Sequence, residues 1–185
     1  MLLGYTIFDK SLGSIDFDNN KIINTINPHS YCLSRYDKLF YEALQSSDIL
    51  LPDGTGIVLA SKILNNQTIN KIAGADIHQY LLHQANLKTQ KVFYLGAAQS
   101  TLLLIEDKVK KEFPNIIVSS FSPPYKPQFS EIETAQMLEK VNDFNPDILF
   151  VGMTAPKQEK WVFINKENID ANTIVSIGAV FDFYA

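Results

Sequence analysis

The second half of the chain alternates short apolar runs with helical segments, and this rhythm constrains the fold more than any other feature. From Lys91 onward the runs VFYLG, NIIVSS, DILFVG and TIVSIG each read as a short buried strand, and the first three are each followed by a helix or its start. Strands that alternate with helices build a mainly parallel sheet that is covered on both faces. Such sheets bind their ligands at the carboxyl ends of the strands.

The first half is richer in helices. Residues 1–27 hold three β-prone runs, LLGYTIF, SIDF and KIINTI, which predict a small sheet or paired strands. Asn27-Pro28 is a good helix start, because asparagine caps and proline suits the first turn. Apolar residues at helical spacing continue this helix: Cys32, Tyr36, Leu39, Phe40, Ala43 and Leu44. The run DILL then predicts a strand before Asp53, and two more helices are expected over about 55–64 and 76–85.

The sequence therefore predicts an α/β fold. We expect a mainly parallel, Rossmann-like sheet flanked by helices, with a helix-rich N-terminal half that carries short β-strands. No repeat, low-complexity tract or linker divides the chain, so residues 1–185 are interpreted as a single domain with halves at 1–90 and 91–185.

Composition excludes several classes of function. The formal net charge is −4 and the sequence pI is about 5.3, so no positive field favours nucleic acid as a partner. The single cysteine, Cys32, excludes an internal disulfide and is interpreted as a core residue in a reducing compartment. No run resembles a signal peptide or a membrane span, which indicates a cytoplasmic protein. The three histidines lack a pair at i, i+4, so we predict no metal site and no cofactor.

Small residues follow the predicted strands. GAAQS, GMTAPKQEKW and GAVFDF each begin with glycine, so Gly96, Ala97 and Gly152 lie where a ligand would approach the backbone. Turns that lead into helices offer amide donors that suit a diphosphate. GAAQS matches neither G-x-G-x-x-G nor the P-loop pattern, which disfavours a nucleotide-dependent oxidoreductase. A lone glycine after a strand is more often structural than functional.

Asp53, in LLPDGTGIV, has two readings that the local sequence leaves open. Aspartate before a helix is a preferred cap, and the same carboxylate is a candidate for chemistry. In APKQEKW, Pro156 can open a helix with Lys157 and Gln158 in its first turn. Taken alone, this segment predicts that Lys157 and Glu159 lie on a solvated surface.

Six segments taken together are far more specific than any one of them. TINPHS, LLPDGTGIV, KIAGADI, VFYLGAA, ILFVGMTAPKQEKW and SIGAVFDF resemble, in order and spacing, the WecG/TagA/CpsF family of bacterial glycosyltransferases. The resemblance covers nearly the whole chain, and the pairing of PDG-x-G with PKQE is distinctive.

The resemblance implies an inverting, metal-independent glycosyltransferase of cell-surface polysaccharide synthesis. The family moves a sugar of the N-acetylmannosamine type from a UDP-sugar donor to a polyprenyl-diphosphate-linked acceptor. Residues 1–90 would then carry the acceptor and catalytic segment, and residues 91–185 would bind the nucleotide sugar. Inversion needs a base for the acceptor hydroxyl and donors for the leaving UDP.

Carried over by motif, Asp53 matches the proposed base. Thr25 matches the threonine of the family's T-x-N pair near the reacting centre, and Gln158 matches the glutamine of PKQE, so both join Asp53 as catalytic candidates. The substrate-binding candidates are Asn27, Gly54, Lys71, Gly96, Ala97, Tyr125, Gly152, Pro156, Lys157, Glu159 and Asp182.

Two departures from the family pattern follow from the same resemblance. Lys71 stands where the family has the arginine of R-x-x-G-x-D, which keeps the charge and loses the bidentate fork. Relatives continue beyond the FDF segment into a basic, partly apolar tail that reaches the inner face of the plasma membrane, and the sequence stops at Ala185. A nucleotide-sugar-binding protein with impaired catalysis is therefore the alternative. A homo-oligomer also stays open, because the N-terminal strands can pair within or between chains.

Overall fold

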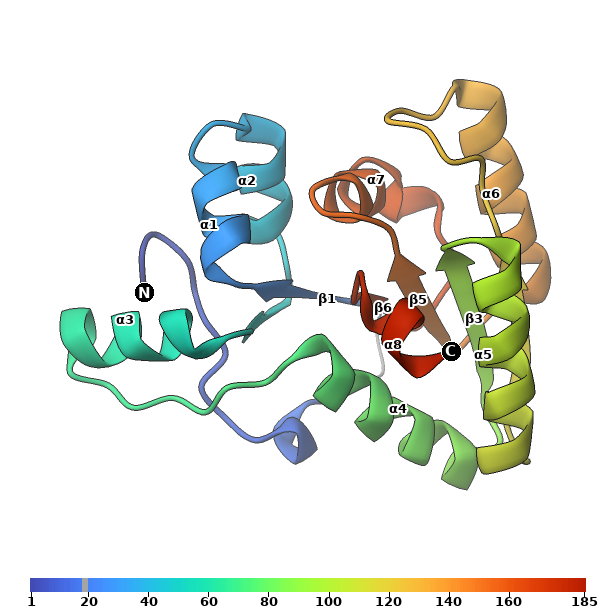
Figure 1. Ribbon diagram of the computed structural model, residues 1–185, viewed down its shortest axis with the longest axis horizontal. Helices are drawn as coiled ribbons and strands as arrows, with labels where there is room; N and C mark the ends of the chain where they lie inside the picture. The colour runs from blue at the N-terminus through green and yellow to red at the C-terminus, as the bar shows by residue number, and fades with distance from the viewer. Residues whose placement is uncertain (18–19) are drawn as a thin grey trace.

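A parallel sheet lies between two layers of helices (Figure 1) in the computed structural model, which describes residues 1–17 and 20–185. In this described part, six strands form one sheet in the order β2-β1-β6-β5-β3-β4, and every neighbouring pair is parallel. The strands are β1 (Lys21–Ile26), β2 (Ile49–Pro52), β3 (Lys91–Gly96), β4 (Ile117–Phe121), β5 (Ile148–Gly152) and β6 (Thr173–Ser176). The predicted parallel α/β sheet is confirmed, and both halves of the chain contribute strands to it.

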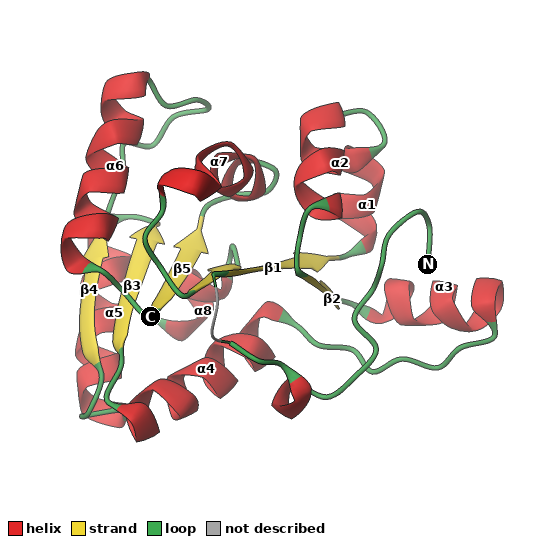
Figure 2. Ribbon diagram, turned by 180° about the vertical axis from the view of Figure 1, so that it is seen from behind, coloured by secondary structure: helices red, strands yellow, loops and turns green. Residues whose placement is uncertain are grey.

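Helices cover both faces of the sheet (Figure 2). Those of the described residues are α1 (Pro28–Ser34), α2 (Lys38–Gln45), α3 (Thr55–Asn65), α4 (Gly74–Lys88), α5 (Gln99–Glu112), α6 (Glu131–Phe144), α7 (Lys157–Asn165) and α8 (Val180–Tyr184), with short 3-10 turns at Leu12–Ser14 and Lys166–Asn168. The capping box of Ser130 and Glu133 that starts α6 is as predicted. None of the helices in the described ranges is both long and apolar enough to cross a bilayer.

Alternate residues along the central strands contribute to two hydrophobic cores, one on each face of the sheet. Tyr94 and Phe150 point to the face that α4, α5 and α8 cover, and their neighbours Phe93 and Leu149 point to the face that α6 and α7 cover. This alternation is the period of two of an extended chain, and both faces of a parallel sheet are buried in this way. The central strands therefore read as unbroken apolar runs, which is why the sequence located them.

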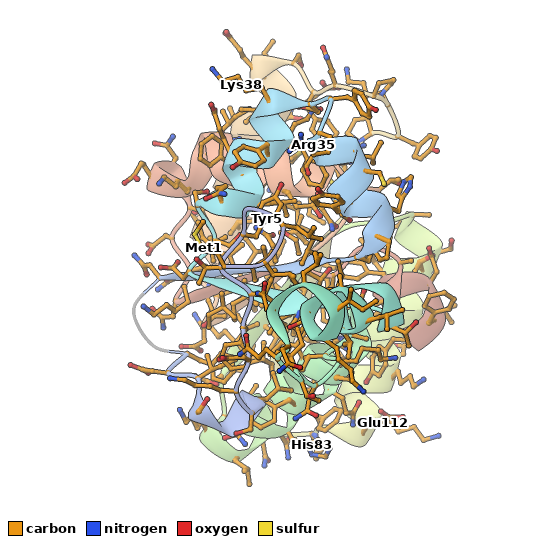
Figure 3. The ribbon with its side chains drawn as sticks, turned by 90° about the vertical axis from the view of Figure 1, so that its left-hand side faces the viewer. Met1, Tyr5, Arg35, Lys38, His83 and Glu112 are labelled. Carbon is orange, nitrogen blue, oxygen red and sulfur yellow. The ribbon has the colours of Figure 1, made fainter. Side chains whose placement is uncertain are left out.

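The N-terminal segment differs from the prediction. KIINTI forms β1, but LLGYTIF holds only an isolated bridge between Leu2 and Tyr5, and SIDF forms no strand. Leu2 packs beside Ile57 of α3, while the hydroxyl of Tyr5 donates to Ser34 Oγ of α1 at 2.8 Å. Figure 3 shows Tyr5 beside the ribbons of α1 and α2. Tyr5 also packs beside Phe40 of α2, and the Phe17 ring of SIDF lies 5.6 Å from the ring of Tyr80 in α4. The β-prone residues of these runs therefore pack against helices, and the predicted strands in LLGYTIF and SIDF are wrong.

The helix predicted to run from Asn27 past Leu44 is broken into α1 and α2. The first part ends at Ser34, and Asp37 caps the second, because its Oδ1 accepts the backbone N–H of Phe40 at 3.0 Å. The break changes which residues share a face. Cys32 is exposed, so the prediction that it lies in the core is wrong, and Tyr36 is 94% exposed.

Two glycines bring the ends of β3 and β5 together. Gly96 lies beside Gly152 in the register, and the backbone N–H of Ala97 donates to the Gly152 carbonyl at 3.1 Å. A Cβ on Gly152 would lie 2.5 Å from Cδ2 of Phe181, so the ring of α8 rests directly on this glycine. Gly96 has a φ of +118°, which favours glycine. Close packing therefore explains why glycine occupies both positions.

We expect Gly152→Ala to destabilise the fold, because the new methyl group has no space beneath the Phe181 ring. Overpacking of this kind typically lowers the free energy of unfolding by about 1–3 kcal/mol. Gly13→Ala is the matched control, since a Cβ on Gly13 would have its nearest neighbour, the hydroxyl of Tyr80, at 3.9 Å. Urea denaturation of both variants tests this, and equal midpoints would contradict it.

Candidate active site

A cavity of about 970 Å³ opens at the carboxyl ends of the strands. Residues directly after β1, β2, β3, β4, β5 and β6 line it, together with the start of α4. Parallel pairing brings all these turns to one edge of the sheet, which is where the sequence predicts a ligand. The cavity is thus built from segments that lie far apart along the chain.

Asp53 faces this cavity and does not cap the helix that follows. The residue at the N-cap position of α3 is Gly54, with φ +90° and no side-chain bond to the helix. The backbone N–H of Asp53 donates to the Ile26 carbonyl at 2.9 Å, and within the described ranges its carboxylate accepts no hydrogen bond. The reading of Asp53 as a helix cap is therefore wrong.

The surroundings of Asp53 make its carboxylate a stronger base. Partial burial is the largest effect and raises the pKa of Asp53, the positive charge of Lys71 lowers it, and the negative charge of Asp76 raises it. The net pKa is above the ordinary value of an aspartate. A carboxylate with a raised pKa and no bound donor is suited to accept a proton.

Thr25 and Asn27 lie on the same wall, at and after the end of β1. Asn27 Oδ1 accepts the backbone N–H of Ser30 at 2.9 Å, so the predicted cap at the start of α1 is confirmed. This bond uses one of the two acceptor positions of the side-chain oxygen. The amide nitrogen of Asn27 and the second acceptor position of its oxygen are left to bind a ligand.

The turns after β3 and β4 form the opposite wall. Ser122 Oγ donates to the carbonyl of Ala97 at 2.7 Å, which joins the two turns. The ring of Tyr125 also lines the cavity and is fully exposed, as a stacking platform for a planar base requires. Asp182 is exposed on the first turn of α8 and lines the cavity too.

Two lysines hold the loop that carries Tyr125. The Nζ of Lys157 donates to the Lys126 carbonyl at 2.9 Å and lies 4.7 Å from the centre of the Phe129 ring. Lys126 Nζ in turn lies 2.6 Å from Glu133 Oε2 at the start of α6. Lys157 is partly buried, which lowers the pKa of its amine. The loop is thus fixed to α7 at one point and to α6 at another.

Gln158 and Glu159 lie buried in the first turn of α7. Gln158 Oε1 accepts the backbone N–H of Met153 at 3.1 Å and of Gly178 at 3.0 Å, which links the turns after β5 and β6. Gln158 Nε2 donates to Glu159 Oε1 at 2.8 Å. Burial raises the pKa of Glu159 to about 7, and only 2% of this residue is exposed. The expectation that Glu159 lies on a solvated surface is therefore wrong.

Most of the predicted site residues meet in this one cavity. Three do not line it: Gly54, Lys71 and Pro156. Those that do are Thr25, Asn27, Asp53, Gly96, Ala97, Tyr125, Gly152, Lys157, Gln158, Glu159 and Asp182. Their roles as catalytic or binding residues stay predictions.

The sequence missed several lining residues. Ser122 and Gln99 lie just after predicted strands, and this position is the sequence signal that could have marked them as lining residues. Gly74, at the start of α4, lies in the KIAGADI segment, and a Cβ there would lie 3.0 Å from Val180 Cγ2. This wall depends on the approach of α4 to α8, which the sequence alone does not reveal.

A second, smaller cavity of about 140 Å³ lies at the amino ends of β5 and β6. Its polar residues include Asp147, whose carboxylate accepts the backbone N–H of Lys91 at 2.8 Å and the amide of Asn172 at 3.2 Å. Both oxygens of this carboxylate serve to join neighbouring strands. The cavity at the carboxyl ends is therefore the better candidate for an active site.

The family model for the glycosyl transferase WecG/TagA/CpsF family matches residues 7–185. The chain belongs to this family. Three relatives are named N-acetylglucosaminyldiphosphoundecaprenol N-acetyl-beta-D-mannosaminyltransferase. The protein from Bacillus subtilis is 29% identical over 92% of this chain, that from Bacillus spizizenii 30% over 97%, and that from Staphylococcus aureus 28% over 90%.

This chain spans about two thirds of the length of these WecG/TagA/CpsF relatives. The matched region covers 65% of the Bacillus subtilis protein, 69% of the Bacillus spizizenii protein and 64% of the Staphylococcus aureus protein. The described cavity lies wholly within the region that the family model matches.

We expect Glu159→Gln to change how stability depends on pH. The folded chain holds the Glu159 proton to a pKa of about 7, against an ordinary value of 4.5. The wild-type protein therefore loses stability relative to the variant as pH rises from 5 to 8, by about 2–3 kcal/mol. Urea denaturation of both proteins at the two pH values measures this, and parallel pH profiles would contradict it.

Proposed function

We propose that this chain is the core of a glycosyltransferase that moves a sugar of the N-acetylmannosamine type from UDP to a polyprenyl-diphosphate-linked acceptor. One observation carries the proposal: the half-buried carboxylate of Asp53, without a hydrogen-bond partner in the described residues, faces a cavity at the strand ends. Membership of the family and the names of the relatives supply the chemistry. We place the reaction at the inner face of the plasma membrane, where lipid-linked acceptors lie.

The reaction that we propose is a single displacement. The acceptor hydroxyl oxygen attacks the anomeric carbon as Asp53 takes its proton, and the bond from that carbon to the diphosphate oxygen breaks. The electron pair leaves with UDP, and the anomeric configuration inverts. The raised pKa of Asp53 favours proton transfer to it. As in the family pattern, the proposed mechanism needs no metal.

The donor nucleotide fits the wall opposite Asp53. The exposed ring of Tyr125 offers a stacking surface for the uracil, with Asp182 as a candidate polar contact for the nucleotide. The turn at Gly96 and Ala97 leads into α5, so its backbone suits the diphosphate. Donor and base would then lie on opposite sides of one cavity, with the sugar between them.

A nucleotide-sugar-binding protein with impaired catalysis is the second candidate, and Lys71 favours it. Lys71 is exposed, does not line the cavity, and lowers the pKa of the proposed base. Transfer to a soluble polyprenyl-diphosphate-linked acceptor separates the two candidates. It should be measured on this chain and on a chain extended to the full length of the relatives. UDP-sugar binding without turnover in both forms would support the second candidate.

We expect Asp53→Asn to abolish most of the transfer and to leave UDP binding intact. Loss of a positioned base typically lowers the rate by about 10²–10⁴-fold. The matched control is Asp170→Asn, because Asp170 is exposed and lies outside the cavity lining. UDP release and calorimetric UDP titration provide the two readouts. Wild-type turnover by Asp53→Asn would exclude Asp53 as the base.

Tyr125→Ala should weaken UDP binding, because the base would lose its stacking surface. Stacking of a base on an aromatic ring contributes about 1–3 kcal/mol, so Kd should rise by about 5- to 150-fold. Tyr125→Phe keeps the ring and should bind nearly as the wild type does. Tyr36→Ala is the control, since Tyr36 is equally exposed and lies outside the cavity lining. Equal calorimetric Kd values for the two alanine variants would argue against stacking.

A further inference from the structure

Gln158 has almost no free hydrogen-bonding capacity. Its side-chain amide has two acceptor positions on Oε1 and two N–H donors on Nε2. In the described structure Oε1 accepts from the backbone N–H groups of Met153 and Gly178, and one Nε2 proton goes to Glu159. A single N–H is left, so toward a ligand in the cavity Gln158 can act only as a donor.

Both ends of this amide are fixed by their partners. If the group turned over by 180°, Nε2 would face two backbone N–H donors and Oε1 would face the oxygen of Glu159. Both backbone contacts would then pair donor with donor, and the contact with the Glu159 carboxylate would pair acceptor with acceptor whenever Glu159 is ionised. Buried polar groups without partners cost free energy. Glu159 is the partner that holds the nitrogen end, at 2.8 Å.

Glu159 itself is held at an energetic cost. It is almost completely buried, and within the described part of the chain its Oε2 has no hydrogen-bond partner. Burial raises the pKa of Glu159 to about 7, which expresses the same penalty on the charged form. An apolar side chain of similar length would avoid this penalty. What the carboxyl group supplies and an apolar group lacks is an acceptor for Gln158.

We propose that Glu159 is a positioning residue, which orients the Gln158 amide so that Oε1 ties together the turns at Met153 and Gly178 and one N–H serves the ligand. Both turns line the cavity, so the orientation of one amide sets the shape of its wall. An N–H donor at this wall suits an oxygen of a sugar or of a phosphate. The ligand part of this inference rests on the proposed function, whereas the amide orientation does not.

Two variants of similar size separate the roles of Glu159. Glu159→Gln keeps an oxygen that accepts from Gln158, whereas Glu159→Met removes the acceptor and keeps the length. In Glu159→Met we expect faster exchange of the Met153 and Gly178 amide protons, and about a tenfold fall in kcat/KM for transfer. Glu159→Gln should recover most of both properties.

Asn165→Met is the matched control. Asn165 is buried at the other end of α7, where its Nδ2 donates to the Trp161 carbonyl at 2.8 Å. Its replacement should lower stability without faster exchange at Met153 and Gly178. The same loss in the control and in Glu159→Met would show a merely structural role and overturn the proposal, as would wild-type exchange and kcat/KM in Glu159→Met.

A measurement on the unaltered protein keeps the proposal testable if Glu159→Met does not fold. One side-chain N–H resonance of Gln158 should exchange slowly, and the other should exchange fast and shift when UDP-sugar is added. Two equally fast protons would contradict the fixed orientation. If the wild-type protein catalyses no transfer while the amide exchange behaves as described, the proposed function fails and the positioning role stands.

Discussion

The close approach of β3 and β5 at Gly96 and Gly152 is the constraint on which the cavity depends. The two glycines lie side by side in the register, and the Ala97 N–H bonds to the Gly152 carbonyl. The absence of a Cβ on Gly152 lets the Phe181 ring rest on the strand end. Parallel pairing brings the turns after β3, β5 and β6 to one edge of the sheet, and the two glycines let these turns pack closely there.

The cavity holds two carboxyl groups that burial affects in different ways. Asp53 is half-buried and its carboxylate accepts no hydrogen bond from the residues that the structure describes, so its raised pKa makes it available as a base. Glu159 is almost fully buried with one oxygen bonded to Gln158, so its raised pKa marks the cost of holding a neighbour in place. Environments that differ in this way allow two carboxyl groups of one site to take different roles.

Much of this fold could be predicted because buried parallel strands read as apolar runs. VFYLG and DILFVG became β3 and β5, and the turns behind them became the cavity wall. LLGYTIF was misread, because its β-prone side chains pack against helices, with Tyr5 beside Phe40 of α2 and Leu2 beside Ile57 of α3, and the segment forms no regular strand. Cys32 was misplaced because the helix stops at Ser34 and a second one starts after Asp37, and spacing alone does not show this break. Glu159 was misread because a glutamate beside a lysine is typical of a surface, and the sequence does not show its buried contact with Gln158.

Hydrogen exchange of the amide protons with and without UDP tests most directly whether the cavity at the carboxyl ends is the donor site. If this cavity binds the donor, amide exchange should slow on UDP addition in the turns that follow β3, β4, β5 and β6. Amide exchange around Asp147 and Thr173, at the amino ends of the strands, should not change. Protection confined to those amino ends, or no protection at saturating UDP, would contradict this assignment.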